Sequence, residues 1–155
     1  YCSATWRNGH QDLPCPGTKN DSTGFVVQED KPRLQDSDTR NAMSLLTHPE
    51  WVDGGVIFGN FPAVAIESGN RFKTTIGCGY GGTNCDVLFR VNYKKDTGPF
   101  IELGTWSMKY SNAPLDIDID LSSLAGSNVR FQFIVSANGS SSQDWAYWVY
   151  PRIAK

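Results

Sequence analysis

The sequence predicts an all-β fold, an antiparallel β-sandwich of the jelly-roll type, from three observations. Short apolar runs recur at intervals of roughly 8–12 residues, the spacing typical of sandwiches and barrels. Turn-forming residues separate most of these runs, and the chain holds 15 glycines and 8 prolines. Several runs alternate between apolar and polar residues, which is the period of a strand with one buried face. We therefore expect many short strands around one core.

Residues 1–24 lack this periodicity and are rich in turn formers, as in the segments Arg7-Asn8-Gly9 and Leu13-Pro14-Cys15-Pro16-Gly17. Their apolar content is too low for an independent core. We expect a disulfide-stapled N-terminal arm or linker over residues 1–24, followed by the β-sandwich domain over residues 25–155.

The four cysteines form two pairs that are close in sequence, although three pairings are formally possible. We favour Cys2–Cys15 and Cys78–Cys85, because each bond closes a short loop rich in turn-forming residues. Zinc is the less favoured alternative, since the sequence has no Cys-x-x-Cys motif and its two histidines lack ligand-like spacing. Disulfides in turn predict an oxidising, extracellular compartment.

The first strands are expected at the apolar runs 25–27, 56–58, 64–66 and 72–76. A helix of one or two turns is expected only around residues 40–46. The glycine-rich segment Gly77-Cys78-Gly79-Tyr80-Gly81-Gly82 lacks the lysine and helix pattern of a phosphate-binding loop. We interpret it as the tip of a disulfide-pinned hairpin.

The later strands alternate more cleanly. Apolar residues occupy every second position over 87–93, 115–121 and 129–135, with polar residues between them. The last strand, 145–150, ends at Pro151. Its period of two places Trp145 and Tyr147 on the face opposite to Ala146 and Trp148, so one set is expected in the core and the other partly exposed.

The charge balance excludes several partners. Lys and Arg number 14 against 16 Asp and Glu, a net charge of −2. No basic field is available for nucleic acid or an anionic membrane surface, and no apolar run approaches the ~20 residues of a membrane span. Paired cysteines would leave no thiol nucleophile, and neither His10 nor His48 lies in a motif that would activate a serine. We therefore expect no enzymatic activity.

Three aspartates, Asp116, Asp118 and Asp120, lie on one face of the expected strand over 115–121. Clustered carboxylates could bind calcium or act as a glycosidase pair. A solvated strand face, with Asp120 capping the following turn, explains the same pattern and is favoured. No cofactor is therefore expected, with calcium at these aspartates left as an alternative.

Aromatic residues exceed what a small sandwich core needs: the chain has 5 Trp and 6 Tyr. Exposed rings beside amides and carboxylates are the usual means of holding a sugar, since a ring stacks on its apolar face while polar groups bind its hydroxyls. The loop aromatics Trp6, Trp51, Tyr80 and Tyr110 are expected to be exposed. The candidate ligand-binding residues are Trp51, Tyr80, Tyr110, Trp148 and Asp144.

Two acceptor sequons begin at Asn20 and Asn138. Both asparagines are glycosylation candidates, as expected of surface loops in an exported protein. Together with the disulfides, they predict a secreted or cell-surface location.

Three stretches, over residues 59–72, 76–89 and 117–146, resemble a β-sandwich domain of secreted, multidomain bacterial proteins. The similarity spans roughly residues 40–153. The chain end, with Trp148 and Pro151-Arg152-Ile153, is similar to galactose-binding-like and malectin-like jelly-roll carbohydrate-binding modules. The resemblance implies a sugar-binding fold and transfers no catalytic residue.

Two functions follow as hypotheses. The first is a non-catalytic extracellular recognition module whose partner is carbohydrate or a cell-surface glycan. The alternative is self-assembly, as a structural subunit of an extracellular filament, sheath or surface layer. In that case the polar arm over residues 1–24 would add to a neighbour's open sheet edge.

Overall fold

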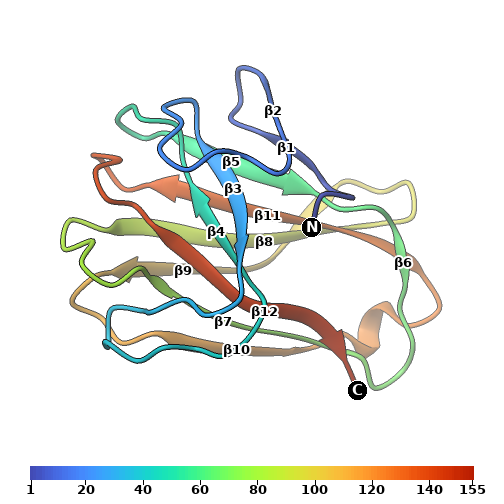
Figure 1. Cartoon of the computed structure of the whole chain (residues 1–155). Helices are drawn as coiled ribbons and strands as arrows, with labels where there is room; N and C mark the ends of the chain where they lie inside the picture. Colours follow the sequence, from blue (N-terminus) through green and yellow to red (C-terminus); the bar gives the residue numbers. More distant parts are fainter.

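The computed structural model describes all 155 residues and contains two antiparallel sheets packed face to face (Figure 1). The first sheet has the order β2-β1-β5-β11-β8-β9, with β6 also pairing with β11. Its strands are β1 Thr5–Arg7, β2 Asp12–Leu13, β5 Val56–Asn60, β6 Val64–Ala65, β8 Asp86–Lys95, β9 Phe100–Lys109 and β11 Asn128–Ala137. The second sheet has the order β10-β7-β12-β4-β3. Its strands are β3 Phe25–Glu29, β4 Ser44–His48, β7 Arg71–Cys78, β10 Leu115–Asp120 and β12 Ala146–Ala154.

The core fills the space between the sheets and follows the predicted alternation. Every second residue is buried along β11 and along β8 as far as Val91, and these side chains meet those of the facing sheet. Trp148 of β12 is fully buried, with its ring centroid 4.6 Å from that of Phe133 and 5.0 Å from that of Phe89. The all-β sandwich prediction is confirmed.

The helix expected around residues 40–46 is wrong. Residues 44–48 form the strand β4, which pairs with β3 and β12 and is buried at every position. Leu45 faces the main core, whereas Leu46 packs on the outer face of the second sheet. Because β4 is covered on both faces, its sequence lacks the alternation of a strand with one exposed face, and two adjacent leucines alone do not distinguish a strand from a buried helix. The only helical element is the 3-10 turn η1, Ser122–Leu124, and no helix could cross a membrane.

Residues 1–24 lie against the sandwich of their own chain. Strand β1 pairs with β5, and Trp6 stands directly opposite Gly59. A Cβ at Gly59 would lie 2.7 Å from the Trp6 ring, so glycine leaves the space that the indole fills. Trp6 is only 2% exposed, and the expectation that it is exposed is therefore wrong. The predicted Cys2–Cys15 bond is confirmed.

The predicted Cys78–Cys85 bond is also confirmed, but the hairpin expected around it is wrong. Cys78 ends β7 in the second sheet, whereas Cys85 directly precedes β8 in the first sheet. The glycine-rich loop therefore crosses from one sheet to the other. Strands β7 and β8 do not pair with each other because each finds its partners in a different layer.

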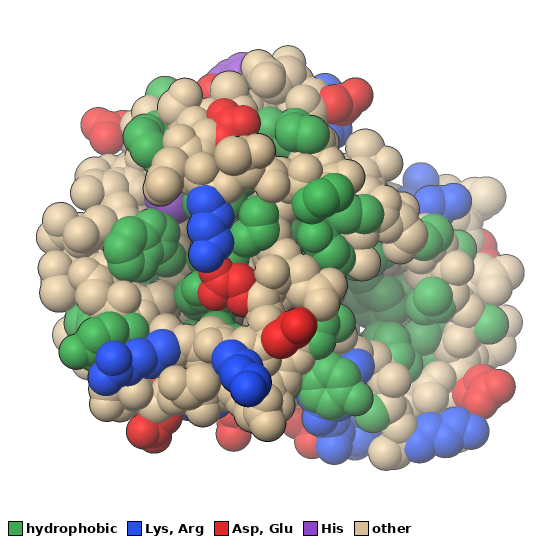
Figure 2. All heavy atoms as spheres, viewed as in Figure 1, with side chains coloured by type: hydrophobic (Ala, Val, Ile, Leu, Met, Phe, Trp, Pro, Cys, Tyr) green, Lys and Arg blue, Asp and Glu red, His purple; other side chains and the backbone are tan.

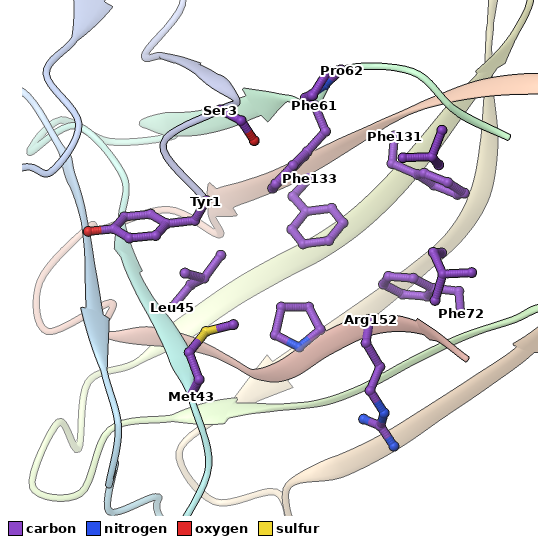
Figure 3. Close-up of a pocket in the computed structure, with 13 residues that line it drawn as sticks. Tyr1, Ser3, Met43, Leu45, Phe61, Pro62, Phe72, Phe131, Phe133 and Arg152 are labelled. Carbon is purple, nitrogen blue, oxygen red and sulfur yellow. The ribbon is translucent and has the colours of Figure 1, made fainter. Parts of the chain in front are cut away.

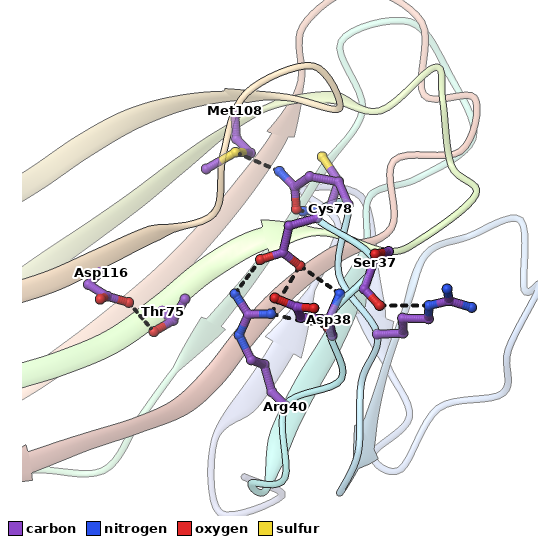
Figure 4. Close-up of polar contacts among 10 residues, drawn as sticks. Ser37, Asp38, Arg40, Thr75, Cys78, Met108 and Asp116 are labelled. Carbon is purple, nitrogen blue, oxygen red and sulfur yellow. Dashed lines mark hydrogen bonds and ion pairs between the residues drawn. The ribbon is translucent and has the colours of Figure 1, made fainter.

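The long loop between β3 and β4 folds over the outer face of the second sheet, where Leu34 is fully buried. The Gln35 amide oxygen accepts a hydrogen bond from the Cys78 backbone N–H at 2.8 Å, and its NH2 group contacts the Met108 sulfur at 3.2 Å (Figure 4). Arg40 forms an ion pair with Asp36 at 2.8 Å inside the same loop. These contacts fix the loop on the sheet.

Candidate functional site

An apolar cavity of about 250 Å³ opens between the two sheets (Figure 3). Phe72, Phe131 and Phe133 are buried around it, and Ser3 and Arg152 are among the few polar residues at its edge. The Arg152 guanidinium points away from the aromatic rings. This cavity therefore lacks polar side chains placed to bind the hydroxyls of a sugar.

Two further hollows, of about 390 and 420 Å³, lie side by side on the outer face of the second sheet and share Asn20 and Trp145. We call them together the aromatic groove. Hydrophobic, basic and acidic side chains all gather on the face over β3 and β4 (Figure 2). The groove is lined by Lys19, Asn20, Phe25, Glu29, Arg33, Leu46, His48, Trp51, Gly79, Tyr80, Ser140, Ser141, Ser142, Gln143, Trp145 and Tyr147.

Outward-facing residues of three adjacent strands form the floor of the groove. Phe25, Leu46 and Tyr147 belong to one buried cluster on β3, β4 and β12. The Tyr147 hydroxyl donates a hydrogen bond to Glu29 Oε2 at 2.6 Å, and Lys19 contacts Glu29 Oε1 at 2.5 Å. Burial and the Glu29 carboxylate raise the pKa of Tyr147, which keeps its hydroxyl protonated as a donor.

Trp145 occupies the centre of the groove, where the two hollows meet. Its backbone carbonyl accepts a hydrogen bond from the Gly79 N–H at 2.9 Å. A Cβ at Gly79 would lie 3.2 Å from the Trp145 Cβ, and a Cβ at Gly82 would lie 3.0 Å from the indole ring. The missing side chains therefore let the glycine-rich loop lie directly against the indole.

Tyr80 and Arg33 form one end of the groove. The Tyr80 ring is 47% exposed, and the Arg33 guanidinium carbon lies 3.7 Å from its centroid. The Tyr110 hydroxyl accepts a hydrogen bond from the Gly81 N–H at 3.0 Å. Tyr110 does not line the groove and instead holds the loop that carries Tyr80.

Trp51 forms the other end and is 47% exposed. Its ring lies 5.9 Å from that of His48, whose Nδ1 is 2.7 Å from the Pro49 carbonyl oxygen. Burial lowers the pKa of His48, so the imidazole is neutral near pH 7. Hydroxyls of residues 140–142 and the Gln143 amide line the same end. This end therefore offers an aromatic ring beside uncharged polar groups.

Trp148 and Asp144 lie outside the groove and are not exposed at all. Trp148 is a core residue, which removes it from the surfaces a ligand can reach. Asp144 Oδ1 accepts a hydrogen bond from the Asp86 N–H at 2.9 Å and so ties the start of β12 to β8. Its Oδ2 has no partner, and burial raises the pKa of Asp144 to about 7.

Trp145 was absent from the candidates, although a signal for it exists in the sequence. The expected alternation is confirmed, because Ala146 and Trp148 face the core while Tyr147 and Trp145 pack on the outer cluster. The sequence does not say which of these faces meets the other sheet. The candidate Trp148 lies on the buried face, whereas Trp145 lies on the outer face, which a ligand can reach.

The three aspartates of β10 are exposed and act separately. Asp118 pairs with Arg71 at 2.6 Å, which lowers the pKa of that carboxyl. Asp116 accepts a hydrogen bond from the Thr75 hydroxyl at 2.6 Å, and Asp120 accepts one from the Ser122 N–H at 2.9 Å. No group of three His, Cys, Asp or Glu side chains could hold a metal ion. The geometry supports the solvated face and turn cap and gives the calcium alternative no support.

The two glycosylation candidates have different surroundings. Asn20 is exposed and lines the aromatic groove, so a glycan attached there would occupy the groove. Asn138 is exposed in the loop after β11, and its NH2 group donates to the Asp86 carboxylate at 3.3 Å. Glycosylation at either asparagine stays a prediction.

Comparison with known proteins identifies the fold. No family model matches the sequence, and no curated protein matches it. Among solved structures, the chain is similar to CBM51 from Clostridium perfringens GH95 in complex with methyl-galactose, at 12% identity and TM-score 0.61, over 84% of this chain and 88% of that one. It is similar to TmCBM61 in complex with beta-1,4-galactotriose, at 8% identity and TM-score 0.56, over 97% and 88%. A cyclase from Fischerella sp. TAU also matches, at 12% identity and TM-score 0.56, over 97% and 83%. The expected resemblance to galactose-binding-like β-sandwiches is therefore confirmed at the level of the fold.

Proposed function

We propose that this protein is a non-catalytic carbohydrate-binding module that holds a glycan in the aromatic groove. The observation that carries the proposal is the set of three rings, the exposed Tyr80 and Trp51 and the half-buried Trp145, that line two adjoining hollows. Two hollows that share a wall suit an extended chain of sugars better than a single sugar ring.

The chemistry of the lining supports a sugar ligand. Trp and Tyr rings combine a large apolar surface with a polar group, so they can stack on the apolar face of a pyranose. Hydroxyl and amide groups of Ser140, Gln143 and Asn20 stand beside these rings and can exchange hydrogen bonds with sugar hydroxyls. The groove thus offers both kinds of contact that a sugar needs.

The fold gives independent support. Two structural neighbours were solved with galactose-type sugars bound, and both match over more than four-fifths of this chain. A fold alone does not determine function. The proposal therefore depends on the groove and uses the neighbours as a reason to test sugars first.

A non-catalytic role is supported by the state of the reactive groups. Glu29 is the only acidic side chain lining the groove, and both of its oxygens are engaged by Lys19 and Tyr147. Most glycoside hydrolases use a pair of carboxyl groups that flank the scissile bond. All four cysteines are in disulfides, which also supports a secreted or cell-surface location.

The assembly alternative loses its motivation. It assumed that residues 1–24 need a neighbouring subunit on which to dock. Strand β1 instead pairs with β5 of the same chain, and Trp6 is buried there. Nothing else in the structure favours a filament.

A glycan array followed by calorimetry tests the proposal. We expect Trp145→Ala and Trp51→Ala each to weaken binding of the selected glycan by about tenfold or more, because each substitution removes a stacking surface. Phe100→Ala is the matched control, since Phe100 is an exposed aromatic on β9 outside the groove. Failure of the folded protein to bind any glycan, or equal affinities for all three variants, would contradict the proposal.

A further inference from the structure

One end of the aromatic groove carries an unbalanced positive charge. The charged residues lining the groove are Lys19, Glu29 and Arg33. Lys19 is paired with Glu29 at 2.5 Å, and the second Glu29 oxygen accepts the Tyr147 hydroxyl. Arg33 has no acidic partner within ion-pair distance. The groove therefore presents one free cation, beside Tyr80.

The Arg33 side chain is held in place from two sides. Its Nε donates a hydrogen bond to the Ser37 carbonyl oxygen at 2.9 Å (Figure 4), and its guanidinium stacks on the Tyr80 ring at 3.7 Å. The backbones of the two residues are also joined, because the Tyr80 N–H donates a hydrogen bond to the Arg33 carbonyl oxygen at 2.9 Å. Less conformational entropy is lost on binding when a side chain is fixed beforehand.

The two terminal nitrogens of Arg33 make no hydrogen bond in the structure, since Nε is the only donor used. Two parallel N–H donors in a planar fork match the two oxygens of a carboxylate. A neutral hydroxyl can use only part of this fork. The free pair of donors beside an aromatic ring therefore suits a sugar that carries a carboxylate.

We propose, building on the sugar-binding function above, that the groove is selective for acidic glycans and that Arg33 binds the carboxylate of a uronic acid unit beside Tyr80. The following units of the chain then extend over Trp145 towards Trp51. Glu29 does not oppose the anion because Lys19 neutralises it.

The test uses uronic acid polymers paired with their methyl esters, which keep the backbone and remove the charge. We use polygalacturonate, polymannuronate and polyglucuronate, and measure affinity by calorimetry on the whole chain at low salt. We expect at least one acid to bind about tenfold or more tightly than its ester, the range of a charge-assisted hydrogen-bond pair. Arg33→Gln should reduce that preference to about twofold or less, mainly by weakening the binding of the acid.

Lys31→Gln is the control for loss of one positive charge, because Lys31 is exposed two residues away and does not line the groove. It should keep the preference for the acid. Equal binding of acids and esters, equal effects of the two substitutions, or a preference for sulfated polymers alone would each overturn the uronic acid inference while leaving the sugar-binding proposal in place. Absence of binding to every polymer and to the glycan array would overturn the proposed function itself.

Discussion

At the scale of single residues, the least predictable feature is the protonation of Asp144. The sequence shows only an aspartate before a strand, whereas the structure removes it from water and leaves one oxygen without a partner. Desolvation disfavours the charged form, which raises the pKa of Asp144 to about 7. Burial of this kind depends on the packing of β8 against β12 and has no local signature.

This pKa shift predicts a pH-dependent stability. Below about pH 4 both the folded and the unfolded chain hold the Asp144 proton; between about pH 4 and 7 only the folded chain keeps it, so the free energy of unfolding should fall as pH rises. Asp144→Asn cannot titrate and should lose this decline, a relative gain of about 4 kcal/mol between pH 4 and 7. Urea unfolding at several pH values measures it.

The control for this series is Asp53→Asn, which makes the same substitution at an exposed position. Identical profiles for the wild type and Asp144→Asn would show that the buried carboxyl does not titrate differently in the folded state.

Residue-scale predictions from the sequence succeeded where exposure follows from local structure. Trp51 and Tyr80 lie in turns between apolar runs and are both 47% exposed. Trp6 is also flanked by polar residues, yet it is buried because its partner surface, Gly59, comes from a strand about fifty residues away. Contacts of this range are invisible in a local pattern.

At the scale of elements, the strand β1 shows how a short segment can matter. It has three residues, but one of them fills a space that Gly59 leaves open in β5. We expect Trp6→Ala to lower the free energy of unfolding by about 3–5 kcal/mol, the range for truncating a buried aromatic side chain. Chemical denaturation measures this loss, with Trp106→Ala, at a half-buried position on the edge strand β9, as the milder comparison. A loss below that of Trp106→Ala would indicate that β1 contributes little.

The positions of strands were predicted best where one face of the strand is buried and the other is exposed to solvent. Strands β8, β10 and β11 have clear alternation, and their positions agree with the expected ranges. Strand β4 lies between β12 and β3 under the loop that carries Leu34, and both of its faces are covered. Its period of two disappears from the sequence for that reason.

At the scale of the whole molecule, the pairing of β1 with β5 makes β1 and β2, which lie within residues 1–24, part of the first sheet. Removal of their contacts would expose an edge of that sheet. We therefore expect one cooperative thermal transition for the whole chain, with equal calorimetric and van't Hoff enthalpies in scanning calorimetry. Two separate transitions, the first confined to residues 1–24, would instead support an independently attached arm.

The sandwich could be predicted from the sequence, but the groove could not. Its lining comes from five segments, around residues 19–20, 25–33, 46–51, 79–80 and 140–147, that meet only because the sheets bring them together. The residues of each segment look ordinary alone. A site built from distant segments can be predicted only when the order of the strands in the two sheets is known. The alternation of apolar and polar residues does not determine that order.

The positions of the tryptophans also allow binding in the groove to be followed by intrinsic fluorescence. Trp6 and Trp148 are shielded from solvent, whereas Trp51 and Trp145 border the aromatic groove. Indole emission shifts to longer wavelength in water and is quenched by small solutes that reach the ring. Emission from Trp51, the most exposed tryptophan, is therefore the part that an added quencher removes first, and an occupant of the groove would protect that part and leave the buried emission unchanged.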